Sequence, residues 1–448
     1  MLTPELSLAP QDYGLLTDLY QLTMAACYVG EQVEQQPAAF ELFVRRLPAD
    51  YGYLMAMGLT QAVEYLQNLS FTAEQVKALQ ASGVFVDAPE RFWSLLENCR
   101  FTGDLWAVAE GTAIFANEPL LRIEAPLWQA QLVETYLLST LNYQTLIATK
   151  SARMRDAAGE SAVLLEFGTR RAFGPHAGMW AARAALAAGF DATSNVLAAL
   201  KLGRKPAGTM AHSLVMALAA LSGDEESAFQ SFRRYFPQSA LLIDTYDPIQ
   251  GARTAAQLMH RDLHESSSDG EMGGVRIDSG NLEQLSRQVQ EILPQGSPIF
   301  VSGDLDEYEI QRLQQSQAPI AGYGVGTRLV TGGCINGVYK LVEINGIPVA
   351  KGSIAKATIP GRKQIFRGSD HDYLGSANED PPPHTSPLLQ PILQQGVLLN
   401  PLPSLEAIAQ QTRTSLHQLP LSIRQLRDPN PWPVHLTPTL QSLKPKNA

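Results

Sequence analysis

The second half of the chain repeats one local pattern, and this repetition restricts the possible folds more than any other feature. From about residue 161, short apolar or β-branched runs end in polar or glycine-rich residues, and most are followed by a helical pattern. The runs are SAVLLEFGTRR, AGFDATSN, AGTMAHS, ALLIDTYDP, GGVRIDSGN, SPIFVSGDLD, IAGYGVGTRL and YKLVEING. Strands that alternate with helices imply a parallel sheet, and seven or eight such units favour a (β/α) barrel. An ordinary doubly wound fold, whose polar residues only cap helices, is the alternative.

Polar side chains gather where these predicted strands end. In a barrel the carboxyl ends of all strands face one mouth, where active sites are built. The residues expected there are Glu166, Arg170, Arg171, Ser194, His212, Asp244, Arg276, Asp278, Asp304, Thr327 and Arg328. The sequence therefore predicts its candidate site at that mouth.

The rest of the 448 residues divides into three further segments. Residues 1–127 mix helical and strand patterns and predict an N-terminal α/β domain. Residues 128–160 predict a long helical bridge, interrupted near Leu141 and Asn142. The barrel is expected over 161–353, and residues 354–448 are expected to form a C-terminal segment that packs back on the N-terminal domain.

Composition limits the partners and the location of the protein. Charged residues are only 17% of the chain, against about 25% in an average soluble protein, which favours an oligomer. The formal net charge of -10 argues against nucleic acid as a partner but allows a local cationic pocket. Cys27, Cys99 and Cys334 suggest neither a disulfide framework nor a metal site. Without a run of about 18 apolar residues, we expect a soluble, cytoplasmic protein with no membrane contact.

Two glycine-containing stretches are candidates for phosphate binding. In GYGVGTR, Gly324 and Gly326 leave backbone amides unobstructed and Thr327 adds a hydroxyl donor, which suits a phosphate monoester. In SGDLDE, Gly303 permits close approach of a phosphate or ribose. The alternatives are an ordinary glycine turn in the first stretch and simple helix capping by Asp304 in the second.

Three further candidates carry charge or a titratable ring. Adjacent Arg170 and Arg171 suit a pyrophosphate or carboxylate, although exposed arginine pairs are common. Arg276 and Asp278 alternate with apolar residues and so share one strand face, where they could bind a carboxylate and sugar hydroxyls or a cation. A buried ion pair is the alternative. His212 stands alone in PAGTMAHSLVMAL, and from its surroundings such a histidine is more often structural.

Several of these stretches occur together in the order of one enzyme family. TDLYQLTM, GTRRAFGPHAG, GTMAHS, VRIDSG, VSGDLDE and GYGVGTRLVT run through most of the chain and together resemble nicotinate phosphoribosyltransferase. The resemblance implies an α/β fold, namely the irregular (β/α) barrel of the type II phosphoribosyltransferases with an N-terminal α/β domain. It also implies a homodimer with shared active sites.

The resemblance implies a reaction as well. Nicotinate, phosphoribosyl pyrophosphate, ATP and water would give nicotinate mononucleotide, pyrophosphate, ADP and phosphate, the first step of NAD salvage from nicotinate. Mg²⁺ would enter with phosphoribosyl pyrophosphate, and the protein's own metal ligands stay unknown. ATP would be coupled through phosphorylation of His212, whose imidazole nitrogen is a competent nucleophile near neutral pH.

Residue roles follow from the resemblance position by position. Arg276, Asp278 and His212 would be catalytic, and nicotinate would meet Thr209, Arg276 and, from the partner subunit, Tyr20 with Asp18 beside it. Phosphoribosyl pyrophosphate would meet Thr327, Gly326, Gly324, Gly303, Arg170, Arg171 and Asp304. The chain departs from the family at Asn281, where aspartate is usual, so turnover could be weaker. One alternative is a nicotinamide-preferring relative, against which Arg276 argues, and another is a homologue without catalysis. A third, an aldolase-type barrel, would need a lysine at a strand end, whereas Lys340 begins its run.

Overall fold

The chain folds into two compact units. The computed structural model describes residues 6–265, 273–351 and 358–443. Unit 1 comprises Met1–Leu146 and Cys334–Ala448, and unit 2 comprises Ile147–Gly333. The predicted boundary between residues 353 and 354 lies outside the described residues.

Unit 2 is built on a six-stranded sheet in which every neighbouring pair is parallel. In chain order its strands are β6 (Val163–Glu166), β7 (Ala192–Thr193), β8 (Leu241–Leu242), β9 (Val275–Ile277), β10 (Ile299–Ser302) and β11 (Gly322–Val325). Their order across the sheet is β7-β6-β11-β10-β9-β8. Most residues of these strands are apolar and buried, as expected for parallel strands that are covered by helices, and the half-buried Arg276 in β9 is a charged exception.

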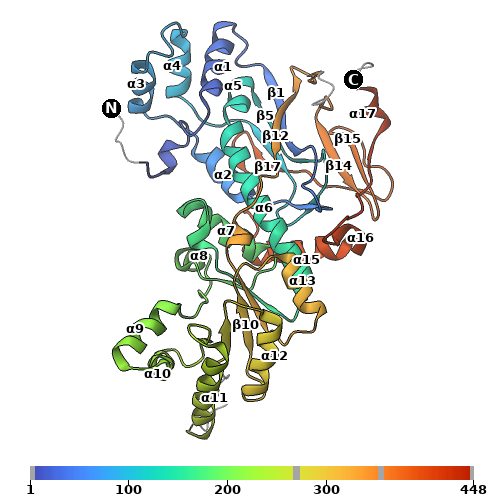
Figure 1. Ribbon diagram of the computed structural model, residues 1–448. Coiled ribbons are helices and arrows are strands. Elements are labelled where there is room, and N and C mark those ends of the chain that lie inside the picture. Colours follow the sequence, from blue (N-terminus) through green and yellow to red (C-terminus); the bar gives the residue numbers. More distant parts are fainter. Residues whose placement is uncertain (1–5, 266–272, 352–357, 444–448) are drawn as a thin grey trace. The chain divides into compact units, whose positions relative to one another are not determined.

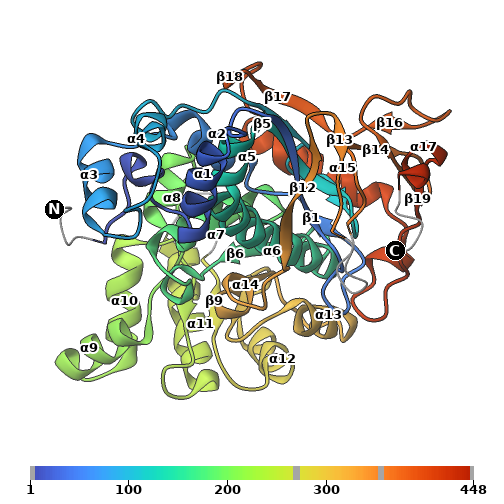
Figure 2. The same ribbon diagram turned by 90° about the horizontal axis from the view of Figure 1, so that it is seen from above.

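Helices connect these strands. They are η2 (Thr169–Arg171), α7 (Pro175–Ala187), α8 (Val196–Lys201), α9 (His212–Ser222), α10 (Glu225–Tyr235), α11 (Pro248–Glu265), α12 (Leu282–Ile292), α13 (Glu307–Gln315) and α14 (Thr327–Val330). Figure 1 shows α12 beside β10, and Figures 1 and 2 both show α9 packed on α10 in the long connection between β7 and β8. That connection runs from one edge strand of the sheet, β7, to the other, β8.

The predicted fold class is confirmed, with two corrections to the predicted strands. Among the described residues, the edge strands β7 and β8 are not hydrogen-bonded to each other, so the sheet does not close into a complete barrel. AGTMAHS, predicted as a strand, is an irregular segment. It makes a single backbone hydrogen bond to the neighbouring strand, from the Ala207 amide to the Thr193 carbonyl, and the chain then enters α9. YKLVEING is a strand, β12 (Gly337–Ile344), but it pairs antiparallel with β1 (Pro37–Val44) in unit 1. Residues 334–351 therefore belong with the N-terminal part of the chain.

Unit 1 contains a seven-stranded sheet in the order β13-β12-β1-β5-β3-β17-β18, in which every neighbouring pair is antiparallel. The strands not yet bounded are β3 (Asp104–Ala107), β5 (Pro119–Pro126), β13 (Ile347–Pro348), β17 (Gln390–Gln394) and β18 (Val397–Leu398). A four-stranded sheet holds β14 (Lys363–Arg367), β15 (Asp372–Ser376), β16 (Ser386–Pro387) and β19 (Val434–Leu436), and a two-stranded one holds β2 (Leu54–Met55) and β4 (Ala113–Ile114). Because β17 pairs with β3, the C-terminal segment shares a sheet with the N-terminal part.

The helices of unit 1 cover one large apolar core. They are η1 (Pro10–Asp12), α1 (Leu19–Gly30), α2 (Leu59–Asn68), α3 (Ala73–Ala81), α4 (Glu90–Glu97), α5 (Leu127–Leu132), α15 (Leu405–Gln418), α16 (Leu421–Arg424) and α17 (Pro438–Ser442). The long α6 (Glu134–Ala158) begins in unit 1 and ends in unit 2. The predicted interruption near Leu141 and Asn142 is wrong: the break falls at Val133, and the Asn142 Oδ1 instead accepts the Gly337 amide, 3.0 Å away, without disturbing the helix.

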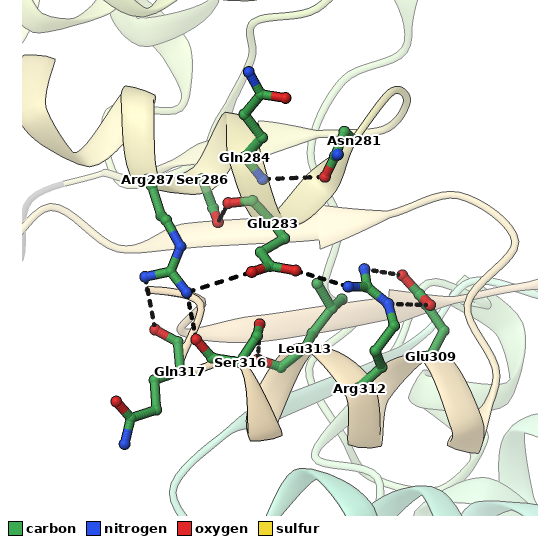
Figure 3. Close-up of polar contacts among 10 residues, drawn as sticks. All are labelled: Asn281, Glu283, Gln284, Ser286, Arg287, Glu309, Arg312, Leu313, Ser316 and Gln317. Carbon is green, nitrogen blue, oxygen red and sulfur yellow. Dashed lines mark hydrogen bonds and ion pairs between the residues drawn. The ribbon is translucent and has the colours of Figure 1, made fainter.

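An ion-pair network joins α12 to α13 (Figure 3). Glu283 lies between Arg287 at 3.6 Å and Arg312 at 2.7 Å, and Arg312 also pairs with Glu309 at 2.8 Å. All four side chains are about a third to a half exposed, so each pair is expected to stabilise the fold by about 1 kcal/mol or less. The network therefore holds together α12, which follows β9, and α13, which follows β10.

Candidate active site

The carboxyl ends of the six parallel strands carry the polar side chains that the sequence placed there. Glu166 ends β6 and is fully buried; its two oxygens accept the Gly168 amide and the Thr193 hydroxyl. Burial raises the pKa of Glu166, and the two hydrogen bonds oppose that rise. Gly168 allows close packing, because a β-carbon there would overlap Val330. This end of the sheet is therefore a fixed frame for the loops above it.

Two aspartates that follow β8 and β9 are joined by hydrogen bonds. The Asp244 Oδ2 accepts the Asp278 amide at 2.9 Å and the Ser279 hydroxyl at 2.6 Å. The Asp278 Oδ1 in turn accepts the hydroxyl of Ser302, the last residue of β10. Three adjacent strand ends are thereby tied together, and hydrogen bonds hold both the backbone amide and one carboxylate oxygen of Asp278.

His212 is the first residue of α9, and its ring faces this cluster. Its Nδ1 lies 3.1 Å from the Thr245 hydroxyl, and its Nε2 lies 3.7 Å from the Asp278 Oδ2. The side chain is 39% exposed, so a reagent in solution can reach the imidazole. The ring is thus oriented by one hydroxyl while its other nitrogen lies beside a carboxylate.

Arg276 lies in β9, two residues before Asp278. Its Nη2 donates to the Met210 carbonyl at 3.0 Å, and its guanidinium lies 5.9 Å from the centre of the Phe167 ring. Burial lowers the pKa of Arg276, while the Asp278 and Asp244 carboxylates act in the opposite direction. Among the residues that the structure describes, its buried Nε has no hydrogen-bond partner. A buried donor without a partner is unfavourable, so this guanidinium is suited to bind an acceptor that the chain does not supply.

Glycines bring backbone close to this cluster at two turns. Gly303 follows β10 with a φ of +99°, and a β-carbon there would overlap the Asp278 carbonyl oxygen. Gly324 lies within β11, where a β-carbon would lie 2.6 Å from the Phe167 ring. Thr327 then begins α14, directly after Gly326. Both predicted phosphate turns thus end strands of the same sheet and lie at its carboxyl edge.

Other predicted residues lie at this edge without a contact that fixes their role. Arg170 and Arg171 lie in η2 and are exposed, and Arg170 is near enough to disfavour the charged form of Arg276. Asp304 is exposed with a φ of +47°, and it does not cap α13, because Asp306 accepts the amides at that helix start. Thr209 is half-buried, and its hydroxyl donates to the Met210 carbonyl at 3.4 Å.

Tyr20 lies in unit 1 on α1. Its side chain is 45% exposed. Asp18 occupies the N-cap position of α1 but does not cap it; its Oδ2 instead accepts the Thr135 hydroxyl at 2.8 Å. Tyr20 is therefore presented on the surface of its unit, next to a carboxylate held by α6.

Some residues at the site were not singled out from the sequence. Thr245 and Ser302 orient His212 and Asp278, and their only sequence signal is that each lies at a predicted strand end next to a chosen residue. Asn281, noted as a departure from the family, has a local structural role: its Oδ1 accepts the Gln284 amide at 3.1 Å and caps α12 (Figure 3).

Comparisons with known proteins identify the family of this chain. Models described as the nicotinate phosphoribosyltransferase N-terminal domain, family and C-terminal domain match residues 15–142, 163–364 and 377–444. The chain belongs to the nicotinate phosphoribosyltransferase family. The resemblance drawn from the motifs is therefore confirmed.

Relatives in this family match along most of their length. The chain is 39% identical over 428 residues to nicotinate phosphoribosyltransferase pncB2 of Mycobacterium tuberculosis, covering 93% of this chain and 89% of that protein. It is 36% identical over 465 residues to the Bacillus subtilis nicotinate phosphoribosyltransferase, covering 95% and 93%. The crystal structure of human nicotinic acid phosphoribosyltransferase matches with a TM-score of 0.80 at 31% identity, covering 96% of this chain and 99% of that one. The nicotinate-nucleotide pyrophosphorylase of Pyrococcus furiosus, 24% identical with a TM-score of 0.75, shares the fold.

Neither a metal-binding cluster nor a membrane-spanning helix is found among the described residues. Within residues 6–265, 273–351 and 358–443, no three His, Cys, Asp or Glu side chains are grouped so that they could hold a metal ion. In the same ranges, no helix is both long enough and apolar enough to cross a bilayer.

Proposed function

We propose that the protein joins nicotinate to phosphoribosyl pyrophosphate and forms nicotinate mononucleotide and pyrophosphate, with ATP and water converted to ADP and phosphate. This would be the first step of NAD salvage from nicotinate. The observation that carries the proposal is the half-buried Arg276 guanidinium at the carboxyl edge of the sheet, whose buried Nε is unpaired among the described residues. Family membership supports the same reaction.

Nicotinate would be bound through its carboxylate by Arg276. A guanidinium can offer two parallel N–H groups to one carboxylate, and burial strengthens this interaction. Thr209, next to the Met210 carbonyl that holds Arg276, would add a hydroxyl. The exposed ring of Tyr20, supplied by the partner subunit of a homodimer, would stack on the pyridine, with Asp18 beside it.

Phosphoribosyl pyrophosphate would lie across the two glycine turns. Amides around Gly324 and Gly326, with the Thr327 hydroxyl, would bind the 5-phosphate, and Gly303 would let the ribose approach. Exposed Arg170 and Arg171 would face the pyrophosphate, and Asp278 and Asp304 would face the ribose or Mg²⁺. This placement of the roles rests on the family pattern and on the shared sheet edge.

The chemical step needs little covalent participation from the protein. The bond from ribose C1 to pyrophosphate breaks as the nicotinate ring nitrogen approaches, and positive charge develops on the ribose. The Asp278 carboxylate would stabilise that charge electrostatically. The Ser302 hydroxyl holds one of its oxygens, and the Asp278 backbone amide is held by Asp244. Mg²⁺ bound to the substrate would neutralise charge on the leaving pyrophosphate, and Asp278 and Asp304 are the carboxylates that would face it.

His212 would be the phosphoacceptor for ATP. With Nδ1 protonated and donating to Thr245, the Nε2 lone pair is free to attack the γ-phosphorus, releasing ADP. Water later cleaves the phosphorus–nitrogen bond and releases phosphate. We further propose that the enzyme acts in the cytoplasm with small molecules only, as a homodimer with shared sites.

The proposal is tested by measuring products of the purified protein with phosphoribosyl pyrophosphate and either nicotinate or nicotinamide, each with and without ATP. We expect nicotinate mononucleotide, formed faster with ATP, with ADP released in parallel. Product from nicotinamide alone would indicate the nicotinamide-preferring alternative. Absence of product from both bases would indicate a homologue without catalysis.

A further inference from the structure

We propose that Lys150 is a positioning residue for the turn at Gly324, Gly326 and Thr327, acting through α14, the helix that this turn begins. The inference rests on the proposed function, which assigns this turn to the 5-phosphate of phosphoribosyl pyrophosphate. Lys150 belongs to the part of α6 that lies in unit 2, the unit that also contains the turn. Its side chain has no role in the mechanism described above.

The Lys150 ammonium binds the carboxyl end of α14. Its Nζ donates to the Arg328 carbonyl and, at 2.7 Å, to the Thr331 carbonyl. The last carbonyls of any helix lack partners within that helix. Because α14 has only four residues, it cannot be stable by itself, and the two bonds from Lys150 fix its end.

Hydrogen bonds continue from that end to Thr327. The Thr331 amide, at 3.1 Å, and the Thr331 hydroxyl, at 2.7 Å, both donate to the Thr327 carbonyl. Lys150 therefore holds Thr331, and Thr331 holds Thr327, through consecutive polar contacts. A shift of the Lys150 side chain would be transmitted to the residue that offers its amide and hydroxyl to the phosphate.

The opposite side of α14 is fixed by packing. Leu329 and Val330 are fully buried, and Val330 lies so close to Gly168 that a β-carbon there would overlap it. The apolar side of α14 can thus move only if the core around Leu329 and Val330 is disturbed. The carboxyl end of α14 is held instead by the hydrogen bonds from Lys150. Both sides are needed to fix the turn in one position.

The choice of lysine at this buried position itself favours a functional role. Lys150 is only 9% exposed and forms no ion pair among the described residues. Burial lowers the pKa of Lys150, and the carboxylates of Glu307 and Asp306 compensate only in part. An apolar residue would be less costly to bury if stability alone mattered. A positive charge at one end of α14 is useful if an anion binds at the other end.

The main test is Lys150→Met, assayed by steady-state kinetics with each substrate varied in turn. Loss of two hydrogen bonds from a charged donor predicts a rise of about tenfold or more in KM for phosphoribosyl pyrophosphate. KM for nicotinate should stay within about twofold, because Arg276 binds that substrate from β9. An unchanged KM for phosphoribosyl pyrophosphate, or equal rises for both substrates, would overturn the inference.

Two control comparisons separate positioning from general stability. Lys363 in unit 1 is a second buried lysine for comparison: its Nζ also donates to two backbone carbonyls, of Ile359 and Gly361, and it additionally pairs with the buried Glu41 carboxylate at 2.7 Å. Lys363→Met should lower the melting temperature without a selective effect on phosphoribosyl pyrophosphate. If Lys150→Met does not fold, Thr331→Val removes one hydroxyl bond and should raise the same KM about two- to tenfold, whereas Thr331→Ser should not. An unchanged KM in Thr331→Val would then overturn the inference.

A binding experiment distinguishes failure of this inference from failure of the proposed function. Ribose 5-phosphate is titrated into wild-type and Lys150→Met protein by calorimetry. If wild type binds it and forms no nucleotide, the proposed reaction fails, and weaker binding by Lys150→Met still supports the positioning role. Equal binding by the two proteins overturns that role. A wild type that neither binds ribose 5-phosphate nor forms product overturns both.

Discussion

Arg276→Ala is the substitution that tests the proposed nicotinate site most directly. The side chain is half-buried; its Nη2 donates to the Met210 carbonyl at 3.0 Å, and its buried Nε is unpaired among the described residues. The donors left over are those that would bind the substrate carboxylate. Alanine removes them together with the positive charge.

The expected loss can be worked out from these contacts. A charge-assisted hydrogen bond contributes about 1.5 to 3 kcal/mol, and two bonds to one carboxylate are less than additive, giving a total of about 2 to 4 kcal/mol. That energy corresponds to a fall of roughly 30- to 1,000-fold in kcat/KM for nicotinate. Nicotinamide carries no negative charge, so its kcat/KM should fall much less. The ratio between the two bases is therefore the informative quantity.

The assay measures nicotinate mononucleotide and nicotinamide mononucleotide formation by wild type, Arg276→Ala and Arg276→Lys. Lysine keeps the charge but offers no planar pair of donors, so it should restore only part of the nicotinate activity. Melting temperatures establish whether the variants are folded. If Arg276→Ala lowered kcat/KM equally for both bases, or left kcat/KM for nicotinate unchanged, the assignment of Arg276 to the nicotinate carboxylate would be refuted.

The remaining predictions concern the phosphoacceptor, the helix cap and pH. His212→Asn should retain transfer but lose stimulation by ATP; if ATP still stimulates it, another residue is the acceptor. Asn281→Asp should change kcat by less than about twofold, because both residues cap helices equally well; a large gain would show that a carboxylate is needed there. Burial and Asp247 raise the pKa of Glu225 to about 7. Because the folded state binds this proton more tightly, the contribution to stability is complete below the unfolded pKa and is lost as pH rises through about 7. Glu225→Gln should therefore raise the melting temperature at pH 8 and not at pH 5, unlike Glu226→Gln as a neighbouring control.

The positions of the main site residues followed from the sequence because strand ends are marked by local patterns. Arg276 and Asp278 alternate with buried Val275 and Ile277, and this two-residue period places both on one face of β9. The sequence placed Asp278 and His212 at one mouth because each follows a predicted strand; Asp278 does follow β9, whereas His212 begins α9 after an irregular segment. The 3.7 Å between their side chains agrees with that expectation.

Other features depend on contacts that no local pattern encodes. YKLVEING has the same apolar content as a barrel strand, but β12 joins β1, which precedes it by almost 300 residues. The break between α5 and α6 carries no glycine or proline at Val133. Lys150 lies within a regular helical pattern, so its contact with α14 is visible only in three dimensions.

Asp278 connects the two reactions that the proposed function requires. One of its oxygens accepts the Ser302 hydroxyl, next to the Gly303 turn, and the other lies 3.7 Å from the His212 Nε2. A phosphoryl group on that nitrogen would place nearly two negative charges beside the carboxylate. Repulsion would then favour any arrangement in which Asp278 turns toward positive charge, and during transfer the positive charge develops on the ribose. In the proposed mechanism, phosphorylation of His212 would thus act on the transfer step through Asp278, so that ATP hydrolysis at this histidine would accelerate a reaction in which the histidine does not attack the ribose.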